Sequence, residues 1–320
     1  MKKTLLFINI LLVVCFVFTL NAFTQTETIE LTLGTSSPGG SWYPATLVMA
    51  KIIQEEIPNV RVTVMPGGSV GNVKGTSKGI YDLALAHTQD IANGIAGEGA
   101  FEEKITNLYG LMNLWTNYVM VAVSKDSNIE SIPDLKGKRI CPGQLGWGGE
   151  ASTRFVLSLY DMTYDDMSKV DYTGWTGMVD LWKDRHIDAA VACSTLGLSS
   201  FQEMAVGGSG IRILPISDEA IEEGVKLNPG YFANVLPAGS FRGQDQEVPV
   251  FSSTTILFSH NELPDDLARN IIKHLLNRRD ELVAALSAFK ELNPEFGAKI
   301  PGVPIHPGAS AYYKEIGVLK

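Results

Sequence analysis

The sequence predicts an α/β protein built from two lobes. Short apolar, β-branched segments alternate with longer segments of helical spacing, which is typical of parallel sheets with helices on their faces. The 320 residues exceed the usual size of one hydrophobic core, and 45% of them are hydrophobic, enough to fill two cores. A strand and two helices follow the second series of strand–helix units, so we expect the chain to leave the first lobe and later return to it.

The first lobe begins with three strands separated by helices. The expected strands are 29–34, 60–65 and 82–86, and the expected helices are 43–57 and 70–78. The long apolar and aromatic stretch 108–123 has room for two strands. The polar, turn-like segment 131–138 then leads into the second series.

The second series has four expected strands and three expected helices. The strands are 139–141, 170–172, 189–192 and 211–214, and the helices are 149–160, 178–185 and 201–206. Segment 228–247 is expected to be loop, and it is followed by a strand at 248–258 and helices at 264–276 and 279–289. We assign 27–122 and 254–320 to the first lobe and 123–253 to the second, with a hinge at 119–123 and 249–254.

Residues 1–22 have the pattern of a secretory signal. Lys2 and Lys3 precede an apolar stretch at 5–20, and Asn21 and Ala22 follow it as a cleavage region. The alternative is an uncleaved membrane anchor, but the stretch is shorter than the roughly 18 residues of a spanning helix. We therefore predict export to the periplasm or another extracytoplasmic space. Cleavage would remove two lysines and no acid, taking the formal charge from -9 to -11.

Charge and cysteine content argue against several classes of partner. An excess of acidic residues disfavours nucleic acid, whose phosphates require clustered Lys and Arg. The three cysteines form no C-x-x-C pair, so we expect no metal and no cofactor. Cys15 lies in the signal segment. Cys141 and Cys193 end two strands, and a disulfide between them or two buried free thiols both remain open.

Three glycine-rich loops predict a ligand cleft. They span 36–41, 66–69 and 146–149, and each follows a strand and opens a helix. Such loops line the crevice at the carboxyl ends of parallel strands, where helix N-termini offer unpaired N–H groups to a carboxylate or phosphate. Any one loop alone is equally well explained as a tight turn, but three loops from two lobes favour a cleft.

Aromatic side chains accompany these loops. Four of the five tryptophans lie at or beside the loops or strand ends: Trp42, Trp115, Trp147 and Trp175. Trp182 lies within a helix and is expected in the core. His87 follows an apolar strand, which either brings it to the cleft or leaves it half-buried.

One motif belongs to an enzyme class. Gly67-Gly68-Ser69-Val70-Gly71 fits the G-x-S-x-G nucleophile elbow, with Ser69 as nucleophile and a downstream histidine, His260, His274 or His306, as base. Against this interpretation, the motif follows only the second strand and Pro66 occupies its approach. A Walker A motif and H-E-x-x-H are absent from the sequence, and we expect no catalytic residues.

A set of short motifs runs in order through nearly the whole chain after the signal segment. It comprises Gly34-Thr35, Gly39-Gly40-Ser41-Trp42-Tyr43-Pro44, Gly67-Gly68-Ser69-Val70-Gly71-Asn72, Tyr81-Asp82-Leu83-Ala84-Leu85, Asp134-Leu135-Lys136-Gly137-Lys138-Arg139, Ile187-Asp188-Ala189-Ala190, Pro237-Ala238-Gly239-Ser240-Phe241-Arg242-Gly243-Gln244 and His306-Pro307-Gly308-Ala309. Together these motifs resemble the TAXI family, the extracytoplasmic solute receptors of TRAP transporters.

The resemblance implies a type II periplasmic binding protein fold, with a mainly parallel sheet and flanking helices in each lobe and the ligand between them. It implies a small organic acid as ligand, often a glutamate-like amino acid, a keto acid or a dicarboxylate, and no catalysis. The implied partner is a TRAP membrane permease, usually fused as a single QM-type protein. A binding protein of an ABC importer or a sensor is the alternative, and we expect a monomer.

The second lobe departs from the family's pattern. Gly146-Trp147-Gly148-Gly149-Glu150 stands where the family typically reads G-S-G-T-R, so a carboxylate would lose donors there. Trp147 suits a planar or bulkier ligand, and Glu150 would accept a hydrogen bond from an amino group. The expected ligand-binding residues are Thr35, Ser36, Ser41, Trp42, Tyr43, Gly68, Ser69, Asn72, His87, Gln89, Gly146, Trp147, Gly148, Glu150, Trp175 and Ser194.

Overall fold

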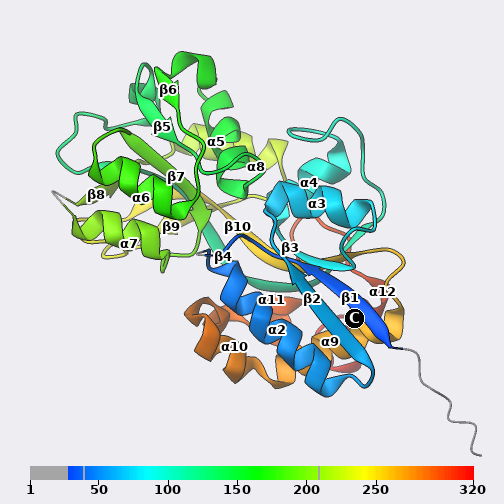
Figure 1. Ribbon diagram of the computed structural model, residues 1–320. Helices are drawn as coiled ribbons and strands as arrows, with labels where there is room; N and C mark the ends of the chain where they lie inside the picture. The colour runs from blue at the N-terminus through cyan, green and yellow to red at the C-terminus, as the bar shows by residue number, and fades with distance from the viewer. Residues whose placement is uncertain (1–27, 39, 208–209) are drawn as a thin grey trace, which may run out of the picture.

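The computed structural model describes residues 28–38, 40–207 and 210–320, and it confirms the two-lobed α/β architecture (Figure 1). The expected signal segment, with Cys15, lies outside the described residues, so export stays a prediction. Among the described helices, none is both long enough and apolar enough to span a bilayer.

The strands form one curled sheet. They are β1 (Ile29–Gly34), β2 (Val60–Met65), β3 (Leu83–His87), β4 (Leu108–Ser124), β5 (Arg139–Cys141), β6 (Lys169–Val170), β7 (Ala189–Ser194), β8 (Ile211–Ile213), β9 (Phe232–Leu236) and β10 (Val248–His260). Their order is β2-β1-β3-β10-β4-β7-β5-β6, with β8 added to β4 and β9 to β10. The outer three strands of each lobe pair in parallel, whereas β4 and β10 pair antiparallel with their neighbours.

β4 and β10 are the two strands that the lobes share (Figure 1). The expectation of two strands in 108–123 is wrong, because β4 is a single strand of 17 residues. From Leu108 to Tyr118 this strand pairs with β10, and from Tyr118 to Val123 it pairs with β7 of the second lobe. Both strands run without interruption from one lobe into the other. No end of a strand therefore marks the expected lobe boundaries or the expected hinge, and these stay predictions.

Helices cover both faces of the sheet. They are α2 (Trp42–Glu56), α3 (Ser69–Ser77), α4 (Thr88–Ala96), α5 (Gly148–Ser158), α6 (Trp175–Lys183), α7 (Ser199–Val206), α8 (Asp218–Leu227), α9 (Asp265–Asn277), α10 (Arg279–Ala285), α11 (Pro294–Gly297) and α12 (Pro307–Glu315). Three short 3-10 helices span Ile132–Leu135, Tyr164–Asp166 and Ser287–Glu291. The helix expected at 279–289 ends early because Leu286 is extended, with φ -149° and ψ 117°.

Five of these helices and strands were not expected from the sequence. They are α4, α8, α11, α12 and β9, the last lying inside the expected loop 228–247. α8 carried a readable start signal, because Ser217 caps the helix by accepting from the Ala220 N–H and two acids occupy the first turn. β9 is an edge strand whose residues alternate between exposed and half-buried, without the apolar run that marks a central strand.

Each lobe is built around its own hydrophobic core. In the first lobe, α2, α9 and α12 pack their apolar residues against the sheet. Trp115, expected near the cleft, is fully buried there, edge-on to Phe289 with ring centroids 4.8 Å apart. The second lobe has a core on each face of the sheet, and Trp182 packs against one of them, as expected. A further cluster of the first lobe lies around α3 and α4, and Ala151 of α5 packs against it, so apolar contact also joins the two lobes.

Candidate functional site

A cavity lies between the lobes, at the carboxyl ends of strands from both. It has a volume of about 50 Å³ and is lined by Ser36, Gly40, Ser41, Trp42, Gly68, Ser69, His87, Pro142, Trp147, Gly148, Gly149, Trp175, Cys193 and Ser194. The three glycine-rich loops meet here, where β1 leads into α2, β2 into α3 and β5 into α5. Ligands of open α/β sheets bind in such a crevice.

Four helices begin at this cavity, two from each lobe. α2 and α3 come from the first lobe and α5 and α6 from the second. No side-chain hydrogen bond caps any of the four, although each has nine or more residues. The first N–H groups of a helix have no partner within it, and its N-terminus carries a partial positive charge. The cavity therefore offers backbone donors suited to an anion.

Ser69 is buried at the start of α3 and lines the cavity. Its Oγ accepts a hydrogen bond from the His87 N–H at 2.9 Å, which leaves the hydroxyl hydrogen to be donated elsewhere. The three histidines weighed as its general base interact with other groups. His260 lies 3.6 Å from Asp82, His274 lies 3.2 Å from Glu56, and His306 contacts the Leu263 carbonyl. None of them lines the cavity, so they do not form a triad with Ser69.

Two indoles of the second lobe form a wall of the cavity. The rings of Trp147 and Trp175 lie with centroids 4.9 Å apart at 37°. Both approach glycines of the first lobe: a Cβ on Gly68 would lie 2.8 Å from Trp147 Cδ1, and one on Gly40 would lie 3.1 Å from Trp175 Nε1. These glycines therefore allow the lobes to approach closely.

A backbone hydrogen bond also joins the two lobes at this point. The Val70 N–H of α3 donates to the carbonyl of Gly146 at 3.2 Å. The loop before α5 thus occupies part of the N-terminus of α3. Gly146 itself has φ +83°, a conformation that favours glycine.

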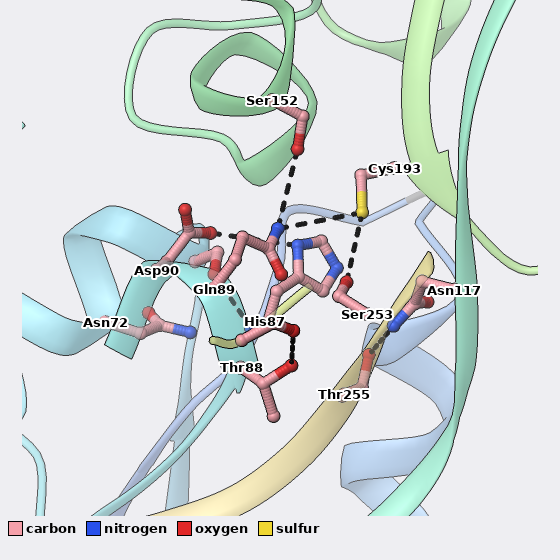
Figure 2. Close-up of polar contacts among 12 residues, drawn as sticks. Asn72, His87, Thr88, Gln89, Asp90, Asn117, Ser152, Cys193, Ser253 and Thr255 are labelled. Atoms are coloured by element: carbon pink, nitrogen blue, oxygen red, sulfur yellow. Dashed lines mark hydrogen bonds and ion pairs between the residues drawn. The ribbon is translucent and has the colours of Figure 1, made fainter. Parts of the chain in front are cut away.

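His87, which lines the cavity, forms a buried pair with Asp90, which does not (Figure 2). Burial lowers the pKa of His87 to about 3, so its ring is neutral. Burial raises the pKa of Asp90 to about 7; the nearby charge of Glu150 adds to the rise, while the Ser69 hydroxyl opposes it. A Cβ on Gly148 would lie 2.1 Å from His87 Nδ1 and 3.1 Å from Asp90 Oδ2, so the pair lies directly against the start of α5.

Further polar groups of both lobes meet beside this pair. Figure 2 shows the Gln89 amide reaching towards the second lobe, where its Nε2 lies 3.5 Å from Ser152 Oγ and 3.8 Å from Cys193 Sγ. Cys193 Sγ lies 3.5 Å from Ser253 Oγ, and burial raises the pKa of this thiol to about 12. Cys141 and Cys193 are both buried free thiols, so the open question is resolved against a disulfide.

Ten of the sixteen expected site residues line the cavity. They are Ser36, Ser41, Trp42, Gly68, Ser69, His87, Trp147, Gly148, Trp175 and Ser194. The other six, Thr35, Tyr43, Asn72, Gln89, Gly146 and Glu150, do not. Four residues that also line it were not among those expected: Gly40, Pro142, Gly149 and Cys193. Pro142 and Cys193 stand at the carboxyl end of a strand, and the two glycines lie in the glycine-rich loops, signals that could have found them.

The residues that fall outside the lining have structural partners. Asn72 Nδ2 donates to the carbonyls of Thr35 and Leu85, so it joins the ends of β1 and β3. Glu150, expected to accept from a ligand amine, instead holds Arg154 at 2.6 Å. In the described part of the chain, no group of three or more His, Cys, Asp or Glu side chains could hold a metal ion.

Comparisons with known proteins identify the fold and a family match. The model of the NMT1-like family matches residues 33–317. A protein of Bordetella bronchiseptica RB50 is 15% identical, with a TM-score of 0.52 over 92% of this chain and 90% of that chain. A Streptococcus mutans structure, from work on glutathione import via GshT and the cystine ABC importer TcyBC, is 14% identical, with a TM-score of 0.51 over 82% of this chain and 95% of that chain. A periplasmic transporter is 16% identical, with a TM-score of 0.51 over 92% and 93%. These likenesses show the periplasmic binding protein fold.

Proposed function

The chain belongs to the NMT1-like family, and on that premise we propose that it is an extracytoplasmic solute-binding protein. It captures a small organic acid between its two lobes and delivers that acid to a membrane permease. The solved structures of the same fold, one of them described as a periplasmic transporter, support the proposal.

The observation that carries this proposal is the meeting at one cavity of four helix starts without side-chain caps, of which α3 already donates its Val70 N–H to the Gly146 carbonyl. Two of the helices belong to each lobe, so an anion at this point would be held by donors from both sides. Binding energy gained from both lobes stabilises the closed arrangement relative to an open one. The two shared strands, β4 and β10, are the connections about which the lobes would close.

For the partner, we propose the permease of a TRAP transporter, on the strength of the ordered motifs that resemble the TAXI family. An ABC importer is the second candidate, favoured by the Streptococcus mutans structure of the same fold. Uptake of the identified ligand into membrane vesicles supplemented with the protein separates the two. Uptake that stops when an ionophore collapses the ion gradient supports the TRAP partner, whereas uptake that requires ATP supports the ABC partner.

Ligand binding tests the function itself. A protein spanning residues 23–320 is screened by thermal shift against amino acids, keto acids, dicarboxylates and aromatic acids. A ligand that binds only the native state raises the melting temperature with its concentration. We expect at least one organic acid to raise the melting temperature, and we expect Ser69→Ala to lower the affinity for that acid at least tenfold. Trp182→Phe, which changes a tryptophan outside the cavity, serves as the control.

Two results would contradict the proposed function. If no organic acid raises the melting temperature, or if Ser69→Ala and Trp182→Phe bind the acid equally well, the cavity is not the solute site. Turnover of a simple ester that disappears in Ser69→Ala would instead support the alternative enzyme, a secreted serine hydrolase with Ser69 as its nucleophile.

A further inference from the structure

The charges around the cavity point to a narrower class of ligand. We infer that the protein binds a small monocarboxylate with a planar apolar body, rather than an amino acid or a dicarboxylate. This inference rests on the proposed function and specifies the chemistry of the same site.

The described lining residues include no Asp, Glu, Lys or Arg. His87, which lines the cavity, is neutral because burial lowers its pKa to about 3. Two acids lie behind the lining without belonging to it. Glu150 is held by Arg154 at 2.6 Å, and Asp90, 3.8 Å from His87 Nδ1, has a pKa raised to about 7 by burial, so it carries only part of a negative charge at neutral pH. An ammonium or a second carboxylate on the ligand would therefore lose its water without gaining a charged partner, which is costly.

One carboxylate, by contrast, finds donors in the cavity. The first turns of α2, α3, α5 and α6 present N–H groups without side-chain caps. The hydroxyls of Ser41, Ser69 and Ser194 lie among them in the lining, and Ser69 already accepts from the His87 N–H. Charge-assisted hydrogen bonds from backbone N–H groups hold a carboxylate without a cation.

His87 provides an independent sign that a polar ligand group belongs here. Its side chain lines the cavity and is only 4% exposed, and its Nδ1 has no hydrogen-bond partner. Buried polar atoms are rarely left unpaired in native proteins, and each exception needs an explanation such as a bound water or ion; this nitrogen also lies 3.8 Å from Asp90 Oδ2.

The rest of the lining selects an apolar, planar body. Trp147 and Trp175 form one wall, and Trp42 and Pro142 add apolar surface. Flat faces favour stacking of a planar group, because ring pairs gain from offset or edge-on packing beyond simple burial. A branched or strongly hydrated chain would leave these faces poorly covered.

The test is isothermal titration of residues 23–320 with probes of similar size. The probes are benzoate, phenylacetate, glutamate, succinate and the uncharged amide benzamide. We expect benzoate or phenylacetate to bind at least tenfold more tightly than glutamate, succinate and benzamide. Trp147→Ala should weaken binding of the aromatic acid at least tenfold, and Trp182→Ala should leave the affinity within about twofold, because Trp147 lines the cavity and Trp182 does not.

The outcomes separate this inference from the function it rests on. Tighter binding of glutamate or succinate overturns the monocarboxylate class but leaves the solute-binding function standing. Equal binding of benzamide and benzoate refutes the role of the charge, and equal losses in the two tryptophan variants refute the stacking wall. If no acid in the panel binds while another organic acid raises the melting temperature in the wider screen, the inference fails and the solute-binding function stands.

Discussion

The carboxylate of Asp90 lies 3.8 Å from Nδ1 of His87, and both side chains are almost fully buried. Neither the His87 Nδ1 nor the two Asp90 oxygens meet a partner in hydrogen-bond geometry. Both residues come from the end of β3 and the start of α4 in the first lobe, yet they face Gly148 at the start of α5 in the second. An unpaired polar pair at the meeting point of two lobes is costly to bury, so it makes the closed arrangement sensitive to protonation.

The stability of the protein should depend on pH through Asp90. Its pKa in the folded protein is about 7, above the value of 3.8 of the free side chain. The folded state therefore binds a proton more readily, and stability from this group is present below about pH 4 and lost as pH rises to about 7. A shift of this size corresponds to at most about 4 kcal/mol.

Comparison with Asp90→Asn isolates this effect. His87 has the opposite dependence, because its lowered pKa costs stability as pH falls below 6.5. Urea unfolding of both proteins at pH 4.5 and pH 8 gives their free energies of unfolding. The value for the asparagine variant, relative to that for the wild type, should be higher at pH 8 than at pH 4.5. An equal difference at the two pH values would contradict the burial of an ionisable Asp90.

A methyl group at the start of α5 should disrupt the contact between the lobes. In Gly148→Ala, the new Cβ would lie 2.1 Å from His87 Nδ1, too close for any adjustment short of moving the ring or the helix. We expect the variant to lose at least tenfold in ligand affinity and to melt several degrees lower. Gly71→Ala in α3 is the matched control, since its Cβ would meet nothing within 4 Å. Equal behaviour of the two variants would show that the lobes do not meet at Gly148 in solution.

The two cysteines should behave as inert thiols. Both are buried and free, and burial raises the pKa of Cys193 to about 12, so little reactive thiolate forms at neutral pH. Residues 23–320 should show no reaction with Ellman's reagent in the native state and two thiols in guanidinium chloride without reductant. Detection of no thiols after unfolding would indicate a disulfide.

The fold class and the place of the site could be read from the sequence, but their details could not. The glycine loops at 36–41, 66–69 and 146–149 follow strands, so their meeting at one sheet edge follows from the topology alone. Trp115 and Trp147 were both expected at or beside a loop or strand end, but Trp115 lies in the core against Phe289. Only tertiary packing separates those two indoles, and the pairing of Glu150 with Arg154 likewise depends on side-chain geometry.

Glu150 offers the sharpest contrast between a sequence-based role and the structure. Its position in the loop favours contact with a ligand amine, whereas its carboxylate holds Arg154, which stacks over Tyr164 at 4.4 Å. Glu150→Gln should therefore leave the affinity for the tightest organic acid within about twofold, and it should cost about 0.5 kcal/mol of stability through the lost helical ion pair. Titration calorimetry and urea unfolding measure the two effects. A tenfold loss of affinity for a ligand with an amino group, without loss for its deaminated analogue, would restore Glu150 as the amine acceptor. Glu150 would then have to release Arg154 whenever the ligand binds.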